Sequence, residues 1–198
     1  MVRPLDAEIA DLMQVVREIR DTTDESGYSI GVAVGQHGAF THTRGPASAL
    51  ERSLVLDAAR RGASQAGLWV EEVSGSLDIV TSSECAIRRY RVKRVKLNAE
   101  GGYEVICGEG SSLLVSDPES LVRQEKWILG YVMSDDHTID HLMAAEIVDW
   151  RGDGPVYLVL GPILDLSDNQ PPRGFTSTDE GLPGFEEEDG EAENVSGF

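Results

Sequence analysis

Short apolar runs separated by glycine-bearing turns constrain the fold of the middle of this chain most strongly. Three turn sequences, Ser74–Ser76, Glu100–Gly102 and Gly108–Gly110, contain glycine, which adopts the positive φ that tight turns require. Turns this close together join neighbouring antiparallel strands. The spacing therefore predicts a meander with strands at Leu68–Val73, Leu77–Thr81, Ala86–Leu97 and Tyr103–Cys107, and a further candidate at Leu113–Val115.

The first third of the chain predicts two helices around a hairpin. Apolar residues recur every three or four positions over residues 5–24, which is the spacing of one helix face. Pro46 suits the first turn of a second helix, expected to run to Ala66. Between them, alternating residues predict two strands, Tyr28–Gly35 and Ala39–Thr43.

The remaining elements are expected in residues 116–166. A capping sequence at Ser116 indicates a helix start. Either a short helix to about Glu125 followed by a strand at Trp127–Met133, or one continuous helix, fits the pattern. Apolar residues at helical spacing predict a helix over Ser134–Trp150. A last strand is expected at Pro155–Leu166, with a bend at Gly161 and Pro162.

The composition changes after Leu166. Residues 167–198 contain nine acidic residues and one basic residue, and no apolar period continues there. We expect residues 1–166 to form one α+β domain, with a mainly antiparallel sheet covered on one face by helices. Residues 167–198 are predicted to be a disordered acidic tail.

Composition also limits the classes of function. A net charge of −18 over 198 residues disfavours nucleic acid and anionic membranes as partners. No apolar run is long enough to cross a bilayer, and the acidic first residues do not resemble a signal peptide. Two cysteines, Cys85 and Cys107, do not make a disulfide framework. We expect a cytoplasmic protein with no membrane contact.

A basic run is the clearest candidate contact surface. Six of the 17 basic residues fall within nine positions around one tyrosine. On a strand they would lie on both faces, suited to an acidic partner, to the acidic tail of the same chain or to a phosphate backbone. Basic residues also protect an edge strand from aggregation. The candidate residues are Arg88, Arg89, Tyr90, Arg91, Lys93, Arg94 and Lys96.

A histidine cluster supports an alternative, metal-dependent hydrolase function. On a helix, His137 and His141 would project from one face at the spacing that binds a metal, with Asp140 as a carboxylate ligand. Position 138 is threonine rather than the glutamate that would serve as general base. Acidic residues are also favoured at any helix start, so the cluster fits a plain helix N-terminus as well.

The function predicted from the sequence is non-catalytic protein interaction without a cofactor. Phe185 and Phe198 lie among acidic residues and could dock in a basic, apolar groove of a partner protein. Small residues at Tyr28–Gly35 and in the second helix could serve internal packing or a homo-oligomer. The alternatives are the hydrolase and nucleic-acid binding through Arg88–Lys96.

Overall fold

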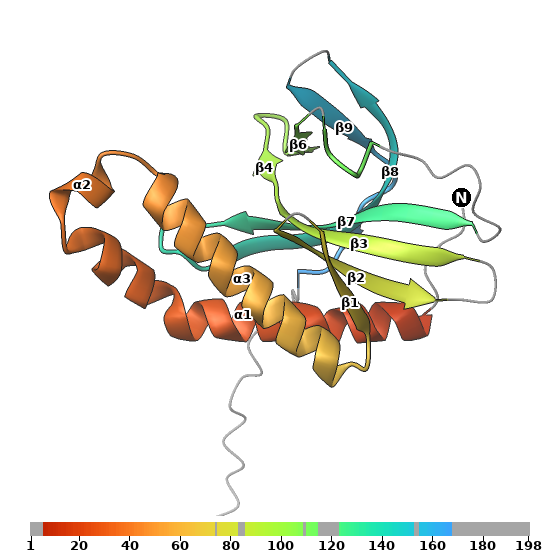
Figure 1. The fold of residues 1–198 in the computed structure, drawn as a ribbon, viewed down its shortest axis with the longest axis horizontal. Helices are drawn as coiled ribbons and strands as arrows, with labels where there is room; N and C mark the ends of the chain where they lie inside the picture. The colour runs from red at the N-terminus through yellow and green to blue at the C-terminus, as the bar shows by residue number, and fades with distance from the viewer. Residues whose placement is uncertain are drawn as a thin grey trace, which may run out of the picture. The chain divides into compact units, whose positions relative to one another are not determined.

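A computed structural model of the chain describes residues 6–73, 75–82, 86–108, 110–114, 123–152 and 155–167. The chain divides into two compact units, Met1–Ser167 and Asp168–Phe198, and all described residues belong to the first. This unit has the predicted α+β fold, with two long helices covering one face of a mostly antiparallel sheet (Figure 1). Within the described ranges, no helix is long and apolar enough to cross a membrane.

The helical layer is a hairpin of α1 (Asp6–Gly35) and α3 (Gly45–Gln65), joined by the short α2 (Gly38–Thr41). The predicted helix over 46–66 is confirmed as α3. Gly62 allows the two long helices to approach closely, since a Cβ there would lie 2.8 Å from the Cα of Val15. The apolar face of α1 is fully buried at Leu12, Val16 and Ile19.

The hairpin predicted between the helices is wrong. Tyr28–Gly35 continues α1, because Gly27 and Ile30 are buried and extend the buried face of Ile19 and Thr23 at helical spacing. Ala39–Thr43 falls largely in α2, where the Nδ1 atom of His37 accepts a hydrogen bond from the backbone N–H of Ala39 at 3.1 Å. Exposed Tyr28 and Val32 produced the alternation that resembled a strand.

The main sheet has eight strands in the order β1-β2-β3-β7-β8-β9-β6, with β10 also paired to β8, and β4 and β5 form a separate pair. Among the described strands, the pairing of β3 with β7 is parallel and the other pairings are antiparallel. The strands are β1 (Trp69–Val73), β2 (Ser76–Ser82), β3 (Ile87–Arg94), β4 (Lys96–Leu97), β5 (Tyr103–Glu104), β6 (Ile106–Cys107), β7 (Gln124–Met133), β8 (Ile139–Arg151), β9 (Val156–Leu160) and β10 (Leu164–Asp165).

Most predicted strands are confirmed, but the helix over Ser134–Trp150 is wrong. That segment contains a turn and then β8, a 13-residue strand. Leu142 and Ala144 pack in the core under the helices, whereas Met143 and Ala145 pack in a second core on the opposite face. Because both faces of the strand are buried, the apolar residues lose the simple alternation of a half-exposed strand.

The other differences are local. The final apolar segment is divided into β9 and β10, with the break at the predicted bend. Leu113 lies in a turn rather than in a strand. The helix expected from Ser116 falls mostly outside the described residues, and Gln124 already belongs to β7.

Candidate functional site

The basic run forms β3, at the centre of the fold rather than at an exposed hairpin. Successive side chains of a strand point to opposite faces of the sheet. Arg88, Tyr90 and Arg94 therefore contact groups on the helical side, and Arg91 and Lys93 lie on the other side. The predicted division of the basic residues between two faces is confirmed, but most of them are not free to meet a partner.

Arg88 and Tyr90 belong to a buried polar network beneath α1. Arg88 is 2% exposed and donates to Glu8 at 2.6 Å and to Glu125 at 2.7 Å. Burial disfavours the charge of Arg88, but the hydrogen bond to Glu125 and the charge of Glu8 outweigh it and raise the pKa of Arg88. The hydroxyl of Tyr90 donates to Glu8 at 2.9 Å, and burial next to that carboxylate raises the pKa of Tyr90.

Three more arginines of β3 are neutralised by carboxylates. Arg91 forms a two-contact ion pair with buried Asp78 on β2, one contact being 2.9 Å. Arg89 pairs with Glu71 on β1. Arg94 lies 2.5 Å from Glu51 on α3, which is itself 5% exposed. Arg88 and Arg91 are therefore unavailable to the phosphates of a nucleic acid.

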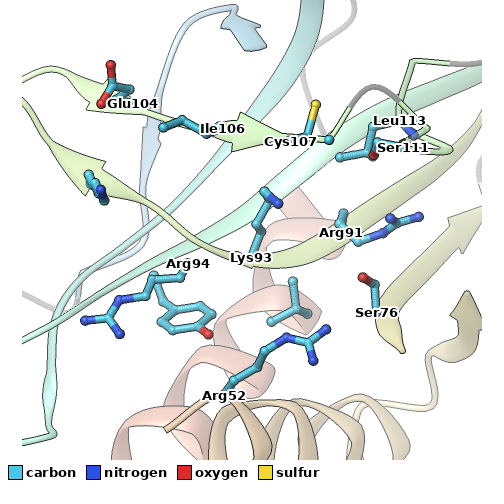
Figure 2. Close-up of a pocket in the computed structure, with 14 residues that line it drawn as sticks. Arg52, Ser76, Arg91, Lys93, Arg94, Glu104, Ile106, Cys107, Ser111 and Leu113 are labelled. Atoms are coloured by element: carbon cyan, nitrogen blue, oxygen red, sulfur yellow. Dashed lines mark hydrogen bonds between the residues drawn. The ribbon is translucent and has the colours of Figure 1, made fainter. Parts of the chain in front are cut away.

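A cationic pocket of about 440 Å³ lies beside β3, beyond the point where its pairing with β2 ends. The register of β3 with β2 ends at the pair Asp78–Arg91, whereas its register with β7 continues to Arg94. We call Val92–Arg94 the free edge of β3. In Figure 2, Lys93 points from this edge toward β6, and Arg94 leaves on the opposite side. The pocket is lined by Arg52, Ser76, Arg91, Val92, Lys93, Arg94, Lys96, Glu104, Ile106, Cys107, Gly108, Ser111, Leu113 and Tyr131.

The pocket contains cations that the fold does not neutralise. Within the described residues, no carboxylate lies at ion-pair distance from Arg52, Lys93 or Lys96. Arg52 donates to the backbone carbonyl of Gly75. Among the lining residues that the structure describes, Glu104 is the one carboxylate. The chain as a whole carries a net charge of −18, so these cations make the pocket a local region of positive charge.

Lys93 is a partly buried cation of this pocket. Burial lowers the pKa of Lys93, and the positive charges of Arg91 and Arg52 add to this effect, while Cys107 opposes it. Cys107 is a buried free thiol on β6. A negatively charged group in the pocket would stabilise the Lys93 ammonium, so the arrangement favours binding of an anion.

The histidine cluster does not form the predicted helical pair. His137 lies in the turn between β7 and β8 with φ of 62°, and its Nδ1 atom is 2.7 Å from Glu51 on α3. His141 lies on β8 and packs edge-on against the ring of Tyr103. Asp140 is exposed. Among the described residues, no group of three or more histidine, cysteine, aspartate or glutamate side chains could hold a metal ion.

Two predicted contact residues are not tested by the structure, and one residue of the pocket was not predicted. Phe185 and Phe198 lie outside the described residues, so their contact role stays a prediction. Arg52 was missed, because it reaches the pocket from α3, about 40 positions before Lys93 in the sequence. Nothing in its local sequence distinguishes Arg52 from the other arginines of the helix.

Comparisons with known proteins identify no relative. No family model, no curated protein and no solved structure matches this chain.

Proposed function

We propose that this chain is a non-catalytic interaction protein that binds a short, extended acidic segment of a partner protein along the free edge of β3. The observation that carries the proposal is that Arg52, Lys93 and Lys96 converge on one pocket with no carboxylate partner among the described residues. All four arginines of β3 are paired with carboxylates, so the cations that lack such a partner support the pocket as a binding site for an external anion.

The positions of the cations on both sides of β3 favour an extended peptide over a compact anion. Lys93 lies on the side of β6, whereas Arg52 reaches the pocket from α3 (Figure 2). Side chains of an added strand alternate between the two faces of a sheet. A peptide aligned with the free edge would direct one acidic side chain to Lys93 and the next to Arg52, as in recognition by strand addition.

The acidic segment and the cytoplasmic location predicted from the sequence are also part of this proposal. The acidic segment with Phe185 and Phe198 is a second contact surface in this proposal. We further propose that the protein acts in the cytoplasm, which the low cysteine content and the buried free thiol of Cys107 support.

Fluorescence anisotropy with a labelled peptide that repeats Glu-Glu-Val-Val tests the proposal, because adjacent glutamates of an extended peptide point to opposite faces. Lys93→Gln and Arg52→Gln should each weaken binding by about ten- to a hundredfold, since a hydrogen bond to a charged group contributes about 1.5 to 3 kcal/mol. Arg17→Gln is the matched control, because Arg17 is exposed on α1 and does not line the pocket. Equal losses in all three variants would reject the pocket as the binding site.

Two altered peptides separate charge from strand addition. A glutamine–valine peptide should not bind if the cations of the pocket determine affinity. A glutamate–valine peptide with methylated backbone nitrogens keeps its charge but cannot pair with a strand edge. Unchanged affinity for the methylated peptide would show that only charge is recognised.

A further inference from the structure

An exposed apolar surface lies at the end of the helical hairpin, apart from the cationic pocket. We call it the helical tip and define it as α1 from Tyr28, α2, and α3 as far as Leu50. Figure 1 shows α2 and the adjoining ends of α1 and α3 extending beyond the strands. Four large apolar side chains are exposed there, namely Tyr28 at 79%, Val32 at 45%, Phe40 at 47% and Leu50 at 42%.

The helical tip also contains an apolar groove. Its volume is about 300 Å³, and it lies between the end of α1 and the start of α3, next to α2. The lining residues are Ala33, Val34, Phe40, Pro46, Ala49 and Leu50. Contiguous apolar surfaces of this kind mark interaction sites in soluble proteins.

The helical tip is uncharged in a chain that is otherwise strongly acidic. Residues 26–43 contain none of the 35 acidic or 17 basic residues. At the border of the tip, Arg44 is neutralised by Asp135 at 2.5 Å. Glu51 is buried between Arg94 and His137.

We infer that a second copy of this chain covers the helical tip, forming a symmetric dimer. A two-fold interface brings the same patch of both copies together, so a charged patch would meet its own charge. Two copies that each carry −18 repel one another over most of their surface. The uncharged tip lets them approach, and pairing of two helical hairpins gives a four-helix arrangement.

Analytical ultracentrifugation of the full chain over a range of concentrations tests this inference. The wild-type protein should form a dimer that Leu50→Glu weakens about a hundredfold or more, because a charge would be buried in an apolar contact. Leu97→Glu is the matched control, since Leu97 is 40% exposed on β4 and away from the tip. A wild-type mass equal to the monomer at every concentration would overturn the inference, as would equal effects of the two substitutions.

A second pair of variants and a salt series distinguish the loss of the dimer contact from a local folding defect. Val32→Glu should dissociate the dimer, whereas Val148→Glu, at a similarly exposed valine on β8, should not. Added salt should tighten the dimer because it screens the repulsion between the acidic copies, but weaken peptide binding in the pocket. Dimerisation and peptide binding therefore fail separately, and Leu50→Glu should leave the peptide affinity unchanged.

Discussion

The carboxylate of Glu8 lies 2.6 Å from the guanidinium of Arg88, although 80 positions separate the two residues and both are buried. Glu8 also accepts hydrogen bonds from the hydroxyls of Tyr90 and Thr81. This contact fixes the first turns of α1 on β3. It also explains why the most basic strand of the chain carries so little free charge.

Glu8→Ala should therefore destabilise the fold strongly. The substitution leaves Arg88 with one buried carboxylate, and removing one partner of a buried ion pair costs about 3 to 5 kcal/mol. Urea unfolding measures the loss directly. Glu25→Ala, on the exposed surface of the same helix, is the control and should change the free energy of unfolding by less than about 0.5 kcal/mol.

Gly27→Ala should destabilise the protein although alanine favours helices. A Cβ at Gly27 would lie 2.6 Å from the carbonyl oxygen of His137, which is backbone and cannot rotate away. The gain in helix propensity of about 1 kcal/mol is then exceeded by an overpacking cost of about 1 to 3 kcal/mol.

Gly35→Ala is the matched control for that prediction. Gly35 is the last residue of α1, and a Cβ there would meet nothing within 4 Å. The control variant should gain up to about 1 kcal/mol in thermal or urea unfolding. A gain in both variants would show that the turn of His137 does not press on α1.

The sequence predicted an element well where the buried residues along that element follow a simple pattern. One face of α3 is buried and its start has a proline, so periodicity located it within two residues. The strand at Trp127–Met133, one of the two alternatives for that segment, lies within β7, where central residues of both faces are buried and the apolar run is continuous. In both cases local pattern and tertiary burial agree.

The errors arose where tertiary contacts decide the structure. The second half of α1 lies at the helical tip, where few residues are buried, so its pattern of Tyr28, Ile30 and Val32 resembled a strand. The candidate site depended even more on distant contacts. The sequence located the basic run, but not which residues the carboxylates Glu8, Asp78 and Glu51 would neutralise.

Tyr131 should make the fold sensitive to high pH. Burial raises the pKa of Tyr131 to about 12, whereas an unfolded tyrosine ionises near pH 10. Its stabilising contribution is complete below pH 10 and is lost as the pH rises toward 12, by up to about 3 kcal/mol. Tyr131→Phe should reduce this loss, and Tyr157→Phe, at an exposed site on β9, should not. Urea unfolding at several alkaline pH values compares them, and identical slopes would contradict the prediction.

Binding of an acidic peptide should weaken with rising pH, because the pocket needs the charge of Lys93. Burial and the charges of Arg91 and Arg52 lower the pKa of Lys93 below its ordinary value of 10.5. The ammonium that attracts the peptide is present below the shifted pKa and is lost above it, while the glutamates of the peptide stay ionised throughout. Affinity should therefore fall at a pH where an exposed lysine is still charged.

In Lys93→Arg the charge persists, since arginine keeps its proton to above pH 12, and the decline should disappear. Anisotropy titrations between pH 7 and pH 10 measure the two profiles. Parallel profiles would assign the decline to another group and remove Lys93 from the site.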